Sequence, residues 1–343
     1  MGFNVVNVFN VPNANFGEDL LEPLGATVVR RGLWHAEDEI IANAAEADAL
    51  VCDATRQPFT RRVISSLSNC RILASVGVGY SGTDLEAARD CGIVVTNVPD
   101  YCIDEVSGRS VAFMLALGHK LFPLDRAVKE RGICFVVDRK ALNEVARPIF
   151  RMREQTVGII GFGRIGMTTA LKAKGLGMRV IAHDPYVFGA VMESLGVKPV
   201  DLDTLLTESD FVSIHSPVTS QTRGMFGYEQ FKKMKPTAYF INVARGDIVD
   251  EAGLTQALRE GLIAGAGLDV TAQEPIPDGN PLRSMPNVIL TGHSAMYSES
   301  ADPELWYKPM TQVVMALKGE WPLYAVNPDV KRNWLEKWGK KSR

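Results

Sequence analysis

The sequence predicts an α/β protein with two domains, each built around a parallel sheet. Three observations lead to this prediction. The chain has 343 residues, which is too long for one ordinary domain. Short apolar runs alternate with helix-like stretches through the first hundred residues, and the alternation starts again near Thr156. Such alternation is typical of parallel strands that are joined by crossover helices.

Five short apolar runs in the first part of the chain are predicted strands, because polar or turn-forming residues bound each of them. These runs are 3–9, 26–29, 49–52, 72–76 and 93–96. Helical patterns lie between them at 37–47 and 84–90. A long helical pattern then runs from Asp104 to about Glu130 and is predicted to leave one domain for the other.

Six further strands are predicted in the second part of the chain. They are 156–160, 179–182, 211–214, 238–243, 264–269 and 288–290. A last helix is predicted over 304–317, and it would have to return toward the first domain. We therefore expect residues 1–102 and 297–343 to form one discontinuous domain and residues 103–296 to form the other.

Composition excludes several classes of function. The formal net charge is −3, so no basic field is expected for a nucleic acid. The longest apolar stretch, 111–117, is far shorter than a membrane span, and the N-terminus does not have the pattern of a secretory signal. Five cysteines without metal-binding or redox spacing indicate a reduced compartment, so we expect a cytoplasmic protein without a metal site.

A glycine-rich turn follows the predicted strand 156–160 and opens a helical stretch. In this turn Gly161 would allow a tight bend, Gly163 would let a pyrophosphate approach the backbone, and Gly166 would let the helix pack on the sheet. The start of the helix offers free N–H groups to an anion. The turn therefore predicts a dinucleotide site, with a glycine turn that binds no ligand as the alternative.

An acidic residue follows the next predicted strand. Asp184 stands about 18 residues beyond the last glycine of the turn. A carboxylate there accepts hydrogen bonds from ribose hydroxyls and repels a 2′-phosphate, which favours NAD over NADP. The alternative is that Asp184 only ends a strand before Pro185.

Polar or reactive residues follow several of the later strands, where ligands bind in open α/β sheets. These strand ends are His215-Ser216-Pro217, Ala244-Arg245-Gly246, Asp269 with Glu274 shortly after it, and Thr291-Gly292-His293-Ser294.

Three of these side chains match the needs of 2-oxo acid reduction. Arg245 would hold the substrate carboxylate, because a guanidinium pairs with it through two bonds and stays charged. His293 would donate a proton to the new alkoxide, and Glu274 would orient the imidazole and stabilise its charged form.

Each of these side chains also has a structural interpretation. Arg245 could pair on the surface with Asp247 or Asp250, and Glu274 could be an exposed loop acid. His293 could be a loop histidine with satisfied hydrogen bonds. His215 could cap its strand or line the cofactor site.

Taken together, the motifs resemble the D-isomer-specific 2-hydroxyacid dehydrogenases over nearly the whole chain. The segments GFGRIG, HDP, HSP-T, NVARG-IVDE, G-GLDV---EP and His293 occur in the order and approximate spacing of that family. Upstream, VGVGY followed by DLEAA, and NVP followed by Tyr101 and Cys102, also resemble its substrate-domain loops. The branch that looks most similar includes bacterial relatives of the C-terminal-binding corepressor proteins.

The resemblance implies an NAD-binding Rossmann-like domain and a flavodoxin-like substrate domain with a cleft between them. It also implies a homodimer that interconverts D-2-hydroxy acids and 2-oxo acids with NAD. Arg245 would be the substrate-binding arginine, Glu274 the acidic partner and His293 the acid/base. Asp269 would contact the nicotinamide carboxamide.

Further contacts follow from the same resemblance. The cofactor would be lined by Val106, Gly161, Gly163, Arg164, Ile165, Gly166, Asp184, His215, Ser216, Pro217, Thr222, Val243, Ala244 and Asp269. The substrate would be lined by Val76, Gly77, Tyr101, Arg245 and Met296.

The chain departs from the family pattern at three places. Gly292 stands before the histidine, where the family usually has proline, and Ser81-Gly82 replaces a common Asp-Asn pair. Met296 stands where the corepressors have tryptophan and is expected to shape the substrate pocket. The resemblance to the corepressors makes an NAD-sensing binding protein with little turnover the alternative function. An enzyme for another small anion, such as formate or phosphite, is a third, although Glu274 disfavours formate dehydrogenases.

Overall fold

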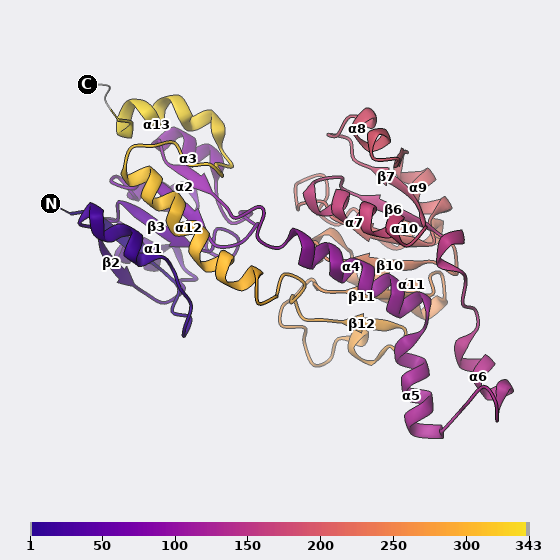
Figure 1. Cartoon of the computed structure of the whole chain (residues 1–343). Coiled ribbons are helices and arrows are strands. Elements are labelled where there is room, and N and C mark those ends of the chain that lie inside the picture. Colours follow the sequence, from indigo (N-terminus) through magenta and orange to yellow (C-terminus); the bar gives the residue numbers. More distant parts are fainter. Residues whose placement is uncertain (1, 341–343) are drawn as a thin grey trace. The chain divides into compact units, whose positions relative to one another are not determined.

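The computed structural model describes residues 2–340, and the chain divides into two compact units (Figure 1). The first unit consists of residues 1–102 and 298–343, and the second consists of residues 103–297. Each unit is built on its own parallel sheet, of five and seven strands respectively. The predicted fold class, α/β with two parallel-sheet domains, is confirmed.

The first sheet has the order β2-β1-β3-β4-β5, which is the flavodoxin-like order. Its strands are β1 (Asn4–Asn7), β2 (Thr27–Arg30), β3 (Ala49–Cys52), β4 (Ile72–Ser75) and β5 (Val94–Thr96). Every residue of β3, β4 and β5 is buried, as expected for parallel strands that helices cover on both faces.

Helices from both ends of the chain cover this sheet. They are η1 (Glu18–Leu24), α1 (Glu37–Ala44), α2 (Arg61–Ser66), α3 (Leu85–Cys91), α12 (Ala301–Leu317), η5 (Pro328–Val330) and α13 (Lys331–Trp338). Helix α12 packs on β3 and β4 and buries Met310, Val313 and Leu317 in the core. The segment after residue 297 therefore completes the first unit.

The second sheet has the order β12-β11-β10-β9-β6-β7-β8. Its strands are β6 (Thr156–Ile160), β7 (Arg179–His183), β8 (Lys198–Pro199), β9 (Phe211–Ile214), β10 (Tyr239–Asn242), β11 (Gly265–Leu268) and β12 (Val288–Leu290). Strand β6 lies between β7 and β9, so the order reverses there. In Rossmann-like sheets this is the point at which a dinucleotide binds.

The helices of the second unit are α4 (Ile103–Gly118), α5 (Leu121–Arg131), α6 (Arg139–Ala146), η2 (Met152–Glu154), α7 (Arg164–Gly175), α8 (Gly189–Ser194), α9 (Leu202–Glu208), α10 (Tyr228–Lys233), η3 (Gly246–Ile248), α11 (Glu251–Glu260) and η4 (Pro281–Ser284). Helices α4, α7 and α9 pack on the sheet, whereas α5 and α6 pack on each other and extend away from it (Figure 1). Phe113 of α4 lies so close to β11 that a Cβ on Gly267 would be 2.6 Å from its ring. The rings of Phe226, Phe231 and Phe240 pack together in the core.

Two predicted helices are wrong in detail, and one strand was not predicted. The single helix predicted from Asp104 to about Glu130 is two helices, because Lys120 adopts a left-handed conformation with φ of 52°. Pro123 then lies in the first turn of α5, where a missing N–H does no harm. The helix predicted over 304–317 begins at Ala301, and it is not the last helix, because η5 and α13 follow it. Strand β8 was missed because it has two residues, one of them a proline.

No helix within residues 2–340 combines the length and the apolar composition that a membrane crossing requires.

Candidate active site

The predicted site residues of the second unit follow neighbouring parallel strands. Strands β6, β9, β10 and β11 run side by side and in the same direction, so their carboxyl ends share one edge of the sheet. The glycine turn, the segment after His215, the turn at Arg245 and the segment after Asp269 all begin at that edge. The topology thus gathers residues that lie more than a hundred positions apart.

The glycine turn fits the backbone of a dinucleotide. Gly161 has φ of 88°, and a Cβ there would lie 2.6 Å from the amide nitrogen of Ser216. A Cβ on Gly166 would lie 2.1 Å from the carbonyl oxygen of Gly161. Gly163 differs, because no atom lies within 4 Å of the place where its Cβ would be. Two glycines therefore serve packing, and the third leaves an open approach for a ligand.

Helix α7 points its N-terminus into this turn. Its first backbone hydrogen bond runs from Met167 N–H to the carbonyl of Gly163. The N–H groups of Arg164, Ile165 and Gly166 therefore have no partner in the helix. Free N–H groups and the positive end of a helix suit a pyrophosphate.

Asp184 connects the end of β7 to the glycine turn. One carboxylate oxygen accepts a hydrogen bond of 2.7 Å from Phe162 N–H, and the other accepts one of 2.8 Å from Tyr186 N–H. Each oxygen retains a lone pair for a ribose hydroxyl. The predicted turn role and the predicted binding role of Asp184 are thus compatible.

The segment after β9 contributes two polar groups without partners in the described part of the chain. His215 Nε2 lies 2.9 Å from Ser213 Oγ, whereas His215 Nδ1 and Ser216 Oγ are buried without a hydrogen-bond partner. Burial lowers the pKa of His215 to about 3, so its imidazole is neutral near pH 7. Thr222 Oγ1 donates to the carbonyl of Pro217 at 2.6 Å, which folds the segment back on itself.

These observations fit NAD at this edge of the second unit. The open face of Gly163, the free N–H groups of α7 and the unpartnered Ser216 hydroxyl would hold it, with Asp184 at its ribose. Val243 and Ala244, at the end of β10, are buried and half-buried respectively, and Val106 is buried on α4.

Arg245 is held at the end of β10 by a buried asparagine. The Asn242 amide donates to the carbonyl of Arg245 at 2.9 Å and accepts from Ala244 N–H at 3.0 Å. The ion pairs considered for Arg245 do not form, because Asp247 pairs with Arg223 at 2.6 Å and Asp250 caps α11.

His293 and Glu274 form a direct pair. Their Nδ1 and Oε2 atoms are 2.7 Å apart, and about a third of each side chain is exposed, 36% and 35%. Partial burial raises the pKa of Glu274, but the hydrogen bond and charge of His293, the N–H of Thr271 and the charge of Arg245 lower it more. Glu274 is therefore held as a carboxylate in contact with the imidazole. Because the charge of Arg245 contributes to the lowered pKa of Glu274, Arg245 lies close enough to interact electrostatically with that carboxylate.

The loop that carries His293 has an unusual backbone. Gly292 and His293 both adopt left-handed conformations, with φ of 59° and 56°. For a histidine this conformation costs about 1–2 kcal/mol, so the surroundings must hold it. They do so through Asp269, which is buried and accepts from Thr291 Oγ1 at 2.5 Å and from Ser294 and Ala295 N–H at 3.0 Å each.

Asp269 thus makes contacts within the protein that were not predicted from the sequence. Both of its carboxylate oxygens bind the segment 291–295, and its main-chain carbonyl accepts from His293 N–H at 2.5 Å. The predicted contact with a nicotinamide carboxamide would have to share these oxygens. In the structure, these hydrogen bonds of Asp269 fix the loop that carries His293.

The predicted substrate residues divide between the two units. Met296 belongs to the second unit, and Val76, Gly77 and Tyr101 belong to the first. Val76 N–H donates to the carbonyl of Cys52 at 2.9 Å, so it is already occupied. Gly77 has φ of 93° with no atom near its Cβ position, and Tyr101 is buried. Of the two predicted backbone positions, Gly77 is therefore the one that is open to a ligand.

Two residues that contact the loops around the site were not predicted from the sequence. Asn242 could have been noticed as the one amide in the apolar run AYFINV. Glu251 accepts hydrogen bonds from Ala272 N–H and Asn280 Nδ2, but it gives no such signal, because an acid in the first turn of a helix is ordinary. Within residues 2–340 there is no cluster of three or more His, Cys, Asp or Glu side chains that could hold a metal.

Comparison with known proteins agrees with this geometry. Residues 111–295 match the NAD binding domain of the D-isomer specific 2-hydroxyacid dehydrogenases. A glyoxylate reductase from Korarchaeum cryptofilum is 37% identical over 291 residues, which cover 85% of this chain and 86% of that protein.

A D-3-phosphoglycerate dehydrogenase from Methanocaldococcus jannaschii is 36% identical over 320 residues, or 93% of this chain and 59% of that longer protein. The solved D-lactate dehydrogenase of Aquifex aeolicus, a complex with NAD and lactic acid, superposes with a TM-score of 0.79 and 26% identity. That match covers 92% of this chain and 96% of the other. The chain belongs to the D-isomer specific 2-hydroxyacid dehydrogenases and is an NAD-dependent oxidoreductase of 2-hydroxy and 2-oxo acids.

Proposed function

We propose that this protein reduces a small 2-oxo acid of the size of glyoxylate to the 2-hydroxy acid, and oxidises the product in reverse, with His293 as the acid/base. The observation that carries the assignment is the 2.7 Å contact between His293 Nδ1 and Glu274 Oε2. The glyoxylate reductase that is 37% identical supports a small substrate.

The proton chemistry belongs to His293. Because Nδ1 is engaged by Glu274, Nε2 is the nitrogen that exchanges a proton with the substrate. In reduction Nε2–H gives its proton to the oxygen on C2, and in oxidation Nε2 takes the hydroxyl proton. Bound NAD(H) supplies the hydride for reduction and accepts it in oxidation.

Arg245 and Glu274 meet the electrostatic needs of the same step. Arg245 would anchor the substrate carboxylate and stabilise the negative charge that grows on the C2 oxygen during reduction. Glu274, kept ionised by its lowered pKa, would stabilise the imidazolium before it donates its proton.

The direct test is oxidation of NADH by the purified protein. Glyoxylate, pyruvate, hydroxypyruvate and phenylpyruvate would be compared, each with NADH and with NADPH. We expect turnover with NADH that is highest for the smallest acids, and weak turnover with NADPH because Asp184 repels the 2′-phosphate. Preference for phenylpyruvate would contradict the assigned substrate size. Preference for NADPH would contradict the role of Asp184.

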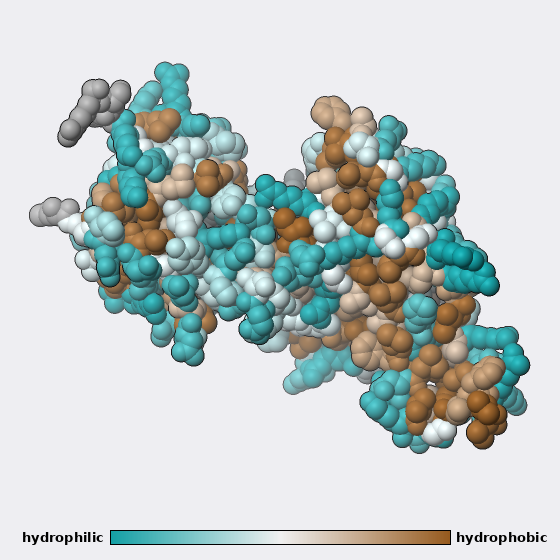
Figure 2. All heavy atoms as spheres, in the orientation of Figure 1, coloured by the Kyte–Doolittle hydropathy of each residue, from teal (hydrophilic) through white to brown (hydrophobic). Residues whose placement is uncertain are grey.

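We also propose that the protein is a homodimer and works in the cytoplasm. Apolar side chains crowd the surface of α5, α6 and the segment between them, which Figure 2 shows as a brown area over these helices. Val136 and Val137 are 87% and 86% exposed, and Phe135 is 57% exposed. A groove lined in part by Leu117, Phe122, Phe150, Tyr239 and Met285 lies in the same unit.

An apolar surface of this kind usually marks an interface. A second copy of this chain is the simplest partner, because homodimers with two-fold symmetry are the commonest oligomers. For the compartment, the support is that Cys52, Cys70, Cys91 and Cys134 are free thiols, the first two of them buried. Fractionation of cells that express the protein tests the location, and recovery in an oxidising compartment would contradict it.

The alternative of an NAD-sensing binding protein is not supported by the relatives described above, which are named as enzymes.

A further inference from the structure

Glu251 lies in the first turn of α11, but its carboxylate does not bond to its own helix. Oε2 accepts a hydrogen bond of 3.0 Å from Ala272 N–H, and Oε1 accepts one of 2.5 Å from Asn280 Nδ2. Asn280 is fixed in turn, because its Oδ1 accepts from Leu282 N–H at 3.0 Å. The two donors stand on either side of Glu274 in the sequence, so one side chain fastens both ends of the loop that carries it.

A second contact fixes the same loop from the side of Arg245. The backbone at Gly246 lies so close to the loop that a Cβ there would be 2.0 Å from the carbonyl oxygen of Thr271. Thr271 N–H in turn donates to Glu274 Oε1 at 3.3 Å. The segment 271–272 is therefore held between Gly246 on one side and Glu251 on the other. Glu274 follows this segment by two residues and contacts His293.

We propose that Glu251 is a positioning residue for the acid/base pair: it holds the loop of residues 271–280 so that Glu274 contacts His293. The proposal rests on the proposed roles of Glu274 and His293. Glu251 acts through the backbone of Ala272 and the side chain of Asn280, and it touches neither reactive side chain in the described structure.

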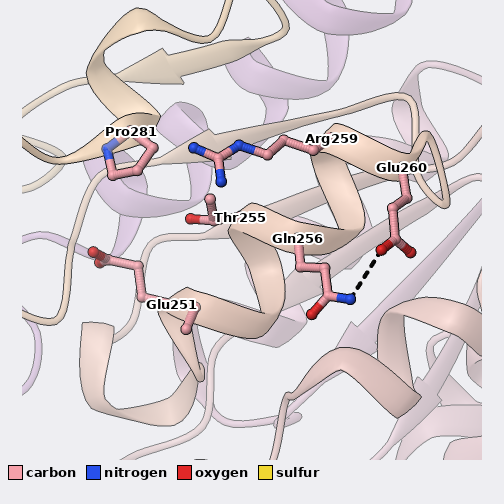
Figure 3. Close-up of a pocket in the computed structure, with 7 residues that line it drawn as sticks. Glu251, Thr255, Gln256, Arg259, Glu260 and Pro281 are labelled. Carbon is pink, nitrogen blue, oxygen red and sulfur yellow. Dashed lines mark hydrogen bonds between the residues drawn. The ribbon is translucent and has the colours of Figure 1, made fainter.

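The same helix offers a matched control. Glu260 stands at the other end of α11, and its carboxylate also accepts two hydrogen bonds, from Tyr228 Oη at 2.5 Å and from Gln256 Nε2 at 2.9 Å. Figure 3 shows Glu251 and Glu260 at opposite ends of α11, with Pro281 near the Glu251 end. Neither partner of Glu260 belongs to the loop 271–280. Neutralising either glutamate removes one negative charge from α11, but only Glu251 holds the loop.

The test is the pKa of Glu274 in the whole protein, measured by carbon NMR with labelled glutamate and assigned with E274Q. In E251Q one acceptor oxygen is lost, and in E251A both are lost. We expect the pKa of Glu274 to rise in E251Q and further in E251A, because Glu274 then loses its contacts with His293 and Thr271. E260Q should leave it unchanged. Far-UV circular dichroism and NADH binding check that each variant folds.

The sign of the shift separates positioning from simple electrostatics. Removing a nearby negative charge by itself lowers the pKa of a carboxyl group, so a rise cannot come from the lost charge of Glu251. A Glu274 pKa that is unchanged or lower in E251Q and E251A would overturn the proposal.

Kinetics give a second readout. We expect E251Q to lower kcat on the order of 10-fold and to move the acid limb of kcat/KM to higher pH, with KM for NADH unchanged. Equal effects in E260Q would overturn the proposal. Failure of the proposed function would show itself differently, as a wild-type protein without oxo-acid turnover, and the NMR titration would still decide the role of Glu251.

Discussion

The pairing of His293 with Glu274 determines which imidazole nitrogen is available for chemistry. Glu274 occupies Nδ1 at 2.7 Å, so the proposed mechanism assigns the proton exchange to Nε2. Its carboxylate is stabilised by the imidazole, by Thr271 N–H and by the charge of Arg245, which together hold the pKa of Glu274 below its ordinary value of 4.5. His215, with a pKa of about 3 that burial imposes, cannot serve as a proton donor near pH 7.

A pH profile of oxo-acid reduction tests the role of Glu274. Because its pKa is lowered, the ionised form persists as the pH falls and is lost only below pH 4.5, so we expect the acid limb of kcat/KM to lie below that value. E274Q should remove this limb and lower kcat/KM on the order of 10²-fold. His215→Asn serves as the control and should keep the limb. A limb that disappears in His215→Asn and stays in E274Q would contradict the assignment.

Residue types and their place at strand ends predicted Arg245, Glu274 and His293 as site residues, and the structure brings Glu274 into contact with His293. The contacts that position them were not predictable in the same way. Asp269 was expected at the cofactor, but its carboxylate binds Ser294 and Ala295 N–H. Glu251 looks like an ordinary acid of a helix N-terminus. Both side chains act on backbone groups more than 20 residues away, and no local pattern reports such contacts.

The loop between β12 and α12 is an element whose shape depends on one glycine. Proline, which the family resemblance leads one to expect at position 292, has φ near −65°. Gly292 has φ of 59°, which proline cannot adopt. The departure from the family pattern therefore corresponds to a different backbone path to His293, and Asp269 fastens that path to the end of β11.

Substitution of Gly292 tests whether the active protein uses this path. Alanine in the left-handed conformation costs about 1 kcal/mol, so G292A should lower both Tm and kcat. G292P should lower kcat more, because the loop must rearrange, while NADH binding is retained. G32A is the control, since Gly32 lies in the first unit, outside the loops that carry Glu274 and His293, and has open space at its Cβ position and no positive φ. Wild-type kcat in G292P would contradict this account of the loop.

Whole elements were easier to predict than their ends. Strands β6, β9 and β12 have the predicted bounds because apolar runs between turn residues define them. The break between α4 and α5 was not expected, because the helical periodicity continues across it, although Pro123 gave a local signal. Strand β8 is too short for any periodicity to appear.

At the scale of the whole molecule, the two sheet orders explain how distant residues meet. The seven-stranded sheet places the ends of β6, β9, β10, β11 and β12 on one edge, so the segments that begin at Gly161 and at Thr291 start from the same edge. Alternating strand and helix patterns predicted this arrangement. They could not predict the exposed apolar surface of α5 and α6, because an amphipathic pattern does not say what covers its apolar face.

Charged substitutions on that surface test the proposed homodimer. Val136→Asp with Val137→Asp should convert a dimer into a monomer in light scattering after size exclusion, because burying two carboxylates without partners is unfavourable. Leu323→Asp is the matched control, since Leu323 is an exposed leucine of the first unit, 72% accessible. A wild-type monomer, or a double variant that remains dimeric, would contradict the proposed interface.

The most direct test of the central claim is the kcat of His293→Gln, measured beside the dissociation constant for NADH. Glutamine retains much of the volume but cannot act as an acid at neutral pH. We expect kcat to fall on the order of 10²-fold or more, while NADH binds as tightly as it does to the wild-type protein. A variant that retains wild-type kcat would contradict the assignment of His293 as the acid/base.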